Sequence, residues 1–109
     1  MISVVGLGNA ASSIAELFSS TPEYNVYRLA SKIKRGKNKK VLKDFRDPEE
    51  YEKNVPNLKN FFKDIDDEVQ FFIVGSSMSS NYALGILEQI KNKNINLFYI
   101  KPDTELLAG

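Results

Sequence analysis

Two turns of small residues carry the groups in this chain that could bind a ligand. The first follows the apolar run Ile2–Val5 and spaces Gly6, Gly8 and Ala11 as G-x-G-x-x-A. Gly6 allows a turn that a β-carbon would penalise, and Gly8 lets a ligand approach bare backbone. Because the turn leads into a helix N-terminus, its unpaired N–H groups favour a phosphate. The same spacing also suits a tight strand–helix turn that binds nothing.

The second turn, Gly75–Asn81, follows the apolar run Val69–Val74 and contains four serines. One serine, at Ser79 or Ser80, would be enough to cap a following helix, so the excess favours a ligand. Backbone N–H groups and hydroxyls would be its donors. The candidate nucleotide-binding residues of the two turns are Gly6, Leu7, Gly8, Asn9, Ala10 and Ala11, and Gly75, Ser76, Ser77, Met78, Ser79, Ser80 and Asn81.

Composition excludes several other kinds of chemistry. The 109 residues contain no cysteine and no histidine, which rules out disulfides, thiolate metal sites and a serine–histidine hydrolase. A net charge of +1 argues against a general nucleic-acid binder. Nine of the fourteen acids lie between Asp44 and Glu68, where they suit helix caps and a solvated face, so we assign no catalytic residue. With no leader and no apolar run long enough to span a bilayer, we expect a cytoplasmic protein without a membrane partner.

Apolar periodicity predicts the helices that hold these turns. Apolar residues at i, i+3, i+4 and i+7 mark one buried helical face in three places. A further helix is predicted from Pro48, with Asp47 as its cap and Glu50 completing a capping box, and it is expected to end before Pro56. The three stripes are Ala11, Ile14, Ala15 and Phe18; Leu58, Phe61, Phe62 and Ile65, in a helix beginning at Asn57; and Ala83, Ile86, Leu87 and Ile90.

Strands alternate with these helices, which predicts one α/β domain over residues 1–109. We expect a Rossmann-like open parallel sheet of four or five strands with helices on both faces. A short strand within Lys40–Asp44 would be the fifth. The other four, in their expected spatial order, are Val26–Leu29, Ile2–Val5, Val69–Val74 and Ile95–Ile100.

The segment Lys32–Lys43 carries seven lysines or arginines and no acid. It could form a phosphate-binding patch or a solvated loop. No aromatic residues interleave with the charges for base stacking, which favours the solvated loop.

The order of these pieces resembles the first part of the tubulin/FtsZ superfamily of GTP-binding, filament-forming proteins. The segment Ile2–Ser12 resembles the family's first strand and glycine-rich loop. Phe71–Asn81 stands where the family has a strand and its G-G-G-T-G-[ST]-G loop, of which this chain keeps Gly75. Leu97–Pro102 resembles the strand and Lys-Pro turn of the bacterial branch.

The resemblance implies GTP or GDP as ligand, with room for Mg²⁺, and self-association into filaments in the full-length protein. The chain ends at Leu106–Gly109, whose apolar side chains would need further residues to pack against. We therefore expect an N-terminal fragment of a longer protein. The family's central helix, acidic loop and second domain would lie beyond it. Residues 1–109 are therefore expected to be at most half of a GTPase site, and inactive alone.

Two alternatives stay open. The first is an NAD(P)-binding Rossmann domain of an oxidoreductase, in which Arg28, Ser31 and Lys32 after the second strand would suit the 2′-phosphate of NADP. The second is a Rossmann-like module without catalytic activity, whose turns are purely structural.

Overall fold

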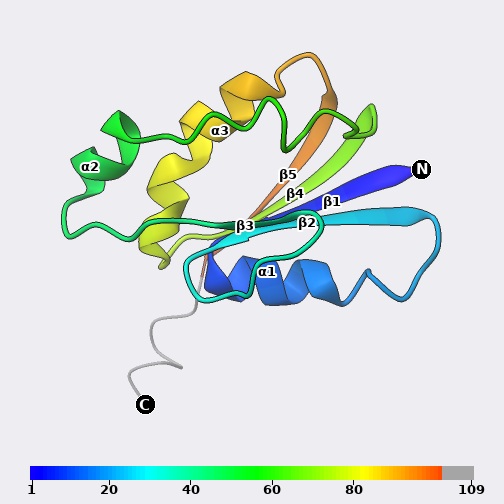
Figure 1. Cartoon of the computed structure of the whole chain (residues 1–109), viewed down its shortest axis with the longest axis horizontal. Coiled ribbons are helices and arrows are strands. Elements are labelled where there is room, and N and C mark those ends of the chain that lie inside the picture. Colours follow the sequence, from blue (N-terminus) through cyan, green and yellow to red (C-terminus); the bar gives the residue numbers. More distant parts are fainter. Residues whose placement is uncertain (102–109) are drawn as a thin grey trace.

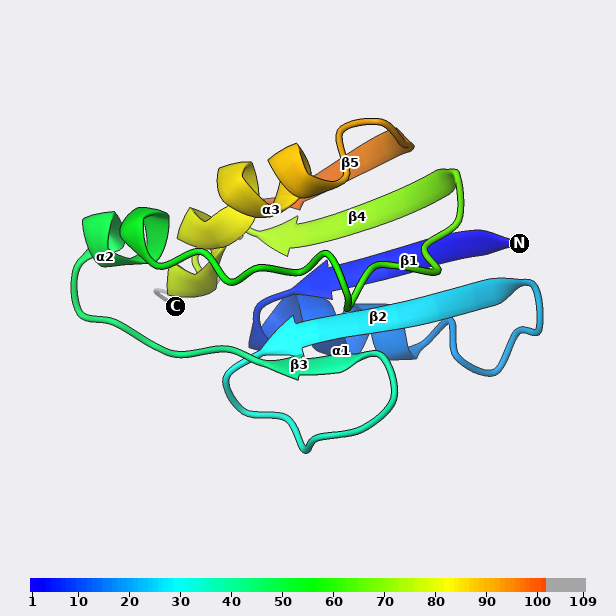
Figure 2. The same ribbon diagram turned by 45° about the horizontal axis from the view of Figure 1, so that its top comes forward.

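A computed structural model describes residues 1–101 and shows one five-stranded sheet in which every strand is parallel to its neighbours. Figure 2 shows the spatial order β3-β2-β1-β4-β5, with all carboxyl ends at one edge. The fold is α/β, consistent with a Rossmann-like open sheet, and the predicted order is confirmed. The strands are β1 (Ile2–Leu7), β2 (Tyr24–Ala30), β3 (Lys39–Val41), β4 (Glu68–Val74) and β5 (Asn94–Ile100).

Helices cover both faces of the sheet, as Figure 1 shows. Helix α1 (Asn9–Glu16) lies on one face, and α2 (Pro48–Lys53) and α3 (Ala83–Gln89) lie on the other. Because α1 returns the chain to β2 on one side of β1, while β4 pairs on the other side, the direction of winding reverses between β1 and β4. Ligands of open α/β sheets bind at such a switch point.

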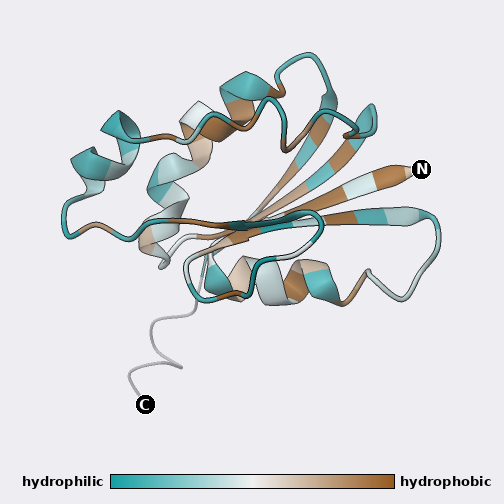
Figure 3. Ribbon diagram, in the orientation of Figure 1, coloured by the Kyte–Doolittle hydropathy of each residue, from teal (hydrophilic) through white to brown (hydrophobic). Residues whose placement is uncertain are grey.

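The main core lies between the sheet and the α2–α3 face. Leu7, Leu29 and Phe71 contribute from three strands, and all three are fully buried. Figure 3 shows apolar positions recurring along the strands of the sheet. Parallel strands covered on both faces are rich in apolar residues, because side chains on each face must be buried. Among residues 1–101, no helix combines the length and apolarity needed to cross a membrane.

The prediction of a helix beginning at Asn57 is wrong, although Leu58, Phe62 and Ile65 of its apolar stripe are buried as expected. Residues 59–64 form turns, with irregular backbone on either side, and Leu58 and Phe62 are nevertheless buried. The backbone N–H of Leu58 donates to the side chain of Gln89 on α3, at 2.7 Å. One helical hydrogen bond follows, from the N–H of Phe62 to the carbonyl of Leu58 at 2.9 Å, and the next bonds are three-residue turns. Tertiary packing therefore buries the stripe without a continuous helix.

Several predicted boundaries also need correction. β1 runs two residues beyond Val5, because Gly6 pairs with Arg28 and Phe72 in the ladder. The segment Lys40–Asp44 overlaps β3 only at its first two residues. Helix α2 does begin at Pro48, but the side chain of Asp47 forms no capping hydrogen bond. The predictions for Leu106–Gly109 fall outside the described residues.

Candidate functional site

The two turns predicted to bind phosphate lie side by side at the carboxyl edge of the sheet. A β-carbon added to Gly8 would lie 2.7 Å from the hydroxyl oxygen of Ser77 and 3.5 Å from Cβ of Ser79. The strands that precede the turns, β1 and β4, are parallel neighbours and therefore end at the same edge. The structure thus brings together the central residues of both turns.

Gly8 forms the bend between β1 and α1. Its φ of +96° is a conformation that residues with a β-carbon rarely adopt. Its N–H donates to the carbonyl of Leu29 at 2.7 Å, which ties the bend to β2. Helix α1 follows at once, and Gly8 offers no side-chain cap to its first N–H groups. Those groups are the ones available to an anion.

Asn9 connects the first turn to the end of β2. Its side-chain amide donates to the hydroxyl of Ser31 at 3.2 Å, and its side-chain oxygen accepts from the backbone N–H of Lys32 at 2.9 Å. Sequence reasoning considered only the backbone of Asn9 and missed this link. The sequence contains one hint of this link: Asn9 stands at the start of a helix, and Ser31, 22 positions later, directly follows the second strand.

Five of the candidate residues are buried: Gly6, Leu7, Gly8, Ala11 and Ser79. The expectation that a ligand approaches the bare backbone of Gly8 is therefore wrong, because Ser77 lies against this glycine. Leu7 and Ala11 are fully buried. A β-carbon on Gly6 would overlap the carbonyl oxygen of Ala11, so Gly6 permits close packing of α1 on β1. These residues shape the turn, whereas Asn9 and Ala10 reach its surface.

The second turn does not lead directly into an α-helix as predicted. A 3₁₀-helix spans Met78–Tyr82, and α3 begins after it. Ser79 and Ser80 lie inside the 3₁₀-helix, so neither is the N-cap; that position belongs to Ser77, which makes no side-chain capping bond. Short 3₁₀ segments of this kind are frequent at the N-termini of α-helices.

Hydrogen bonds within this 3₁₀-helix already use two of the predicted donors. The hydroxyl of Ser80 donates to the carbonyl of Ser77 at 2.7 Å, and the amide of Asn81 donates to the carbonyl of Met78 at 2.9 Å. Ser76 is exposed, and Ser77 faces Gly8. Ser76 and Ser77 are therefore the serines best placed to meet a ligand.

Tyr82 anchors the second turn to the end of the basic segment. Its hydroxyl donates to the carbonyl of Lys43 at 2.6 Å, and its ring packs edge-to-face on Tyr51 of α2 with centroids 4.8 Å apart. Burial raises the pKa of Tyr82, and Tyr51 and Asp44 raise it further, so the hydroxyl stays protonated and donates.

An aromatic side chain that the sequence did not suggest lies beside the second turn. A β-carbon on Gly75 would overlap the ring of Tyr99 on β5, so the glycine makes room for this ring. The ring remains more than half exposed.

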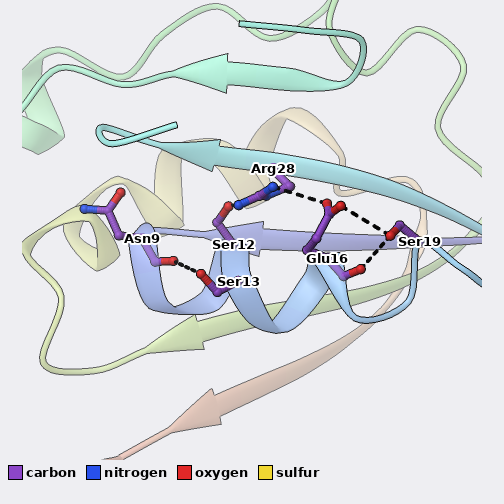
Figure 4. Close-up of polar contacts among 6 residues, drawn as sticks. All are labelled: Asn9, Ser12, Ser13, Glu16, Ser19 and Arg28. Carbon is purple, nitrogen blue, oxygen red and sulfur yellow. Dashed lines mark hydrogen bonds and ion pairs between the residues drawn. The ribbon is translucent and has the colours of Figure 1, made fainter. Parts of the chain in front are cut away.

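Arg28 is not part of this arrangement. Figure 4 shows its side chain directed at α1, where Nε donates to the buried hydroxyl of Ser12 at 2.6 Å and the guanidinium lies 3.2 Å from Glu16. Ser31 and Lys32 lie beside Asn9 instead. The trio proposed for an NADP phosphate is therefore divided, with two members at the edge and one on the α1 face.

A groove of about 820 Å³ lies away from the turns, between residues 55–65 and α3. Its lining includes Leu58, Phe62, Lys63 and Gln89. In the part of the chain that the structure describes, no group of three acidic, histidine or cysteine residues could hold a metal ion.

Comparisons with known proteins identify no relative. No family model matches the sequence, and neither the curated proteins nor the solved structures include a match. The resemblance to the tubulin/FtsZ superfamily therefore receives no support from them.

Proposed function

We propose that this chain is a nucleotide-binding module that holds a phosphate group at the carboxyl edge of its sheet, between the two turns. The observation that carries the proposal is the apposition of Gly8 and Ser77 at the end of two adjacent parallel strands. This place is the switch point of the sheet, where open α/β folds bind their ligands.

The donors for the phosphate come from both sides. Asn9 and Ala10 offer the first N–H groups of α1, at the positive end of its dipole, and Ser76 and Ser77 offer hydroxyls. Because the side chain of Ser77 already lies against Gly8, the phosphate would contact the rim formed by Asn9, Ala10 and Ser77.

GTP or GDP is the first candidate ligand, on the resemblance of the two turns to tubulin/FtsZ loops. Bound phosphates would supply the ligands for any Mg²⁺. A specific contact supports NADP as the second candidate: the Asn9 side chain brings Ser31 and Lys32 to the first turn, where a ribose phosphate would extend. We propose binding without hydrolysis, because the candidate site has no assigned general base.

The experiment is a titration with fluorescent analogues of GTP, ATP, NADH and NADPH. The variant Asn9→Asp adds one negative charge at the start of α1, keeps the oxygen that Lys32 contacts, and favours the helix through its dipole. Repulsion of a phosphate should weaken binding roughly tenfold, or about 1.4 kcal/mol.

Asn92→Asp is the matched control, because it makes the same charge change at an exposed residue just before β5, at the opposite edge. Its affinity should equal that of the wild type. Equal affinities for all three proteins would contradict the proposed site. If none of the four analogues bound the wild type, the remaining interpretation would be a Rossmann-like module whose turns are purely structural.

The variant Gly8→Val, which the G-x-G spacing suggests, does not isolate binding. Any side chain at a φ of +96° is strained, and its β-carbon would meet the Ser77 hydroxyl. Loss of binding in that variant would report a distorted turn.

A further inference from the structure

The β5 edge strand exposes apolar side chains on both faces of the sheet. Leu97 lies on the α3 face, beside Leu84, and Phe98 stacks on Phe72 on the opposite face with centroids 4.8 Å apart. Leu97, Phe98 and Tyr99 are 50%, 44% and 59% exposed, and Leu84 is 81% exposed. Contiguous exposed apolar surface of this kind marks an interaction site.

The two edges of the sheet differ in how they are protected. β3, at one edge, has three residues, two of them lysines, and follows the basic segment. Short length and lysines are the usual means of blocking edge-to-edge pairing. β5 has seven residues, with no charge and no proline among them. Within residues 1–101, no strand pairs with the outer side of β5, which is long enough to accept another strand over seven residues.

We propose that β5 is a homodimer interface, in which it pairs antiparallel with β5 of a second copy of this chain. The two five-stranded sheets would then join into one continuous sheet around a twofold axis perpendicular to it. Main-chain hydrogen bonds along the outer side of β5 hold the pair, and the apolar side chains on each face add cross-strand contacts.

One register brings the exposed apolar side chains together. Centring the pair on Phe98 places that ring opposite the second copy's Phe98, and Leu97 opposite the second copy's Tyr99. Residues opposite each other then share a face, as a pleated sheet requires. Lys101 stands opposite Ile95, so no like charges meet within the paired strands.

Charge matching favours a second copy over a charged partner. An acidic or basic surface would find no complementary group between Asn94 and Ile100, whereas an identical neutral strand matches it. The interface is of limited extent, so we expect a dissociation constant in the micromolar range.

Sedimentation equilibrium of the full 109-residue chain, from about 1 to 200 μM, tests the proposal. The wild type should dimerise within this range. Leu97→Lys should weaken dimerisation at least tenfold, because it places a charge in the middle of the paired edge. Leu17→Lys is the matched control, since Leu17 is a 77% exposed leucine at the end of α1, and it should dimerise like the wild type.

A monomeric wild type at 200 μM would overturn the proposal, as would equal dimerisation of Leu97→Lys and the wild type. A second variant tests the pairing directly if Leu97→Lys fails to fold. Because the chain has no cysteine, Phe98→Cys introduces a single thiol. A short thiol-reactive cross-linker should join two copies of Phe98→Cys and leave Leu17→Cys monomeric, and the reverse result would exclude the β5 interface.

Discussion

The carbonyl oxygen of Ala11 lies against the α-carbon of Gly6, so that no β-carbon fits between the first helix and the first strand. The contact is with backbone on both sides, and a β-carbon would also lie 2.8 Å from Cα of Ser12. Neither α1 nor β1 can yield by rotating a side chain. The position of α1, and with it the start of the candidate site, depends on this contact.

Gly6→Ala should therefore lower the free energy of unfolding by roughly 1–3 kcal/mol, because α1 must move away from the sheet. Urea denaturation monitored by circular dichroism measures the change. Gly36→Ala is the control: its β-carbon would meet only the flexible side chain of Lys39, at 3.2 Å, and it should change stability by less than about 0.5 kcal/mol. Similar losses in both variants would contradict this account of Gly6.

Asp66 should make stability depend on acid pH. Burial disfavours its charge, but hydrogen bonds from Asn25 and Ser3, both 2.8 Å, together with the N-terminal ammonium and Lys93, outweigh burial and lower its pKa. A lowered pKa adds stability that is fully present above the unfolded value of about 3.9 and is lost as pH falls through the folded pKa.

Asp66→Ala should cost about 1–2 kcal/mol at pH 7, since it leaves the buried Ser3 hydroxyl without its acceptor, and should flatten the loss of stability below pH 4. Denaturation between pH 2.5 and 7 gives both quantities. The adjacent Asp67→Ala removes a 94% exposed carboxylate that pairs only with Lys93, and it should have little effect. If Asp66→Ala lost stability below pH 4 as steeply as the wild type, Asp66 would not be the group responsible for the acid dependence.

Gln89 should determine the conformation of residues 56–58. Its amide nitrogen donates to the carbonyls of Pro56 at 2.9 Å and Gly85 at 3.2 Å, while its oxygen accepts from Leu58. Gln89→Ala should lower stability by roughly 1–3 kcal/mol and speed amide exchange at Leu58. The neighbouring Glu88→Ala, at an exposed side chain, is the control and should leave exchange there unchanged. Slow exchange at Leu58 in Gln89→Ala would contradict this role.

Arg28 should stabilise the fold without affecting nucleotide affinity. Arg28→Met removes its contacts with Ser12 and Glu16 and should cost about 1–2 kcal/mol. GTP and NADPH titrations should give wild-type affinities, because the guanidinium lies on the α1 face. Arg35→Met is the control, at an exposed residue of the basic segment, and it should not change the free energy of unfolding. If the basic segment is a solvated loop, Arg35→Met should also leave the affinities for GTP and NADPH unchanged. If Arg28→Met lost NADPH binding but kept GTP binding, Arg28 would have to be a ligand of the NADPH phosphate.

Much of the fold was predictable because its signals are local. The apolar run Val69–Val74 and the stripe from Ala83 to Ile90 each specify an element by their own periodicity, and short connections with right-handed crossovers then fix the strand order. The two turns were recognisable for the same reason. Gly8 and the serines after Gly75 stand directly at the ends of strands, and parallel neighbours bring those ends to one edge.

Contacts between distant residues decided the rest. The stripe Leu58–Ile65 specified burial but not helix: its apolar side chains are held in the core by turns, and the N–H of Leu58 donates to Gln89, 31 positions later. The direction of Arg28 depended on Ser12 and Glu16 lying beneath it on α1. Periodicity shows which face of an element is buried, whereas the partner of each polar group is chosen by the packing of elements that are remote in sequence.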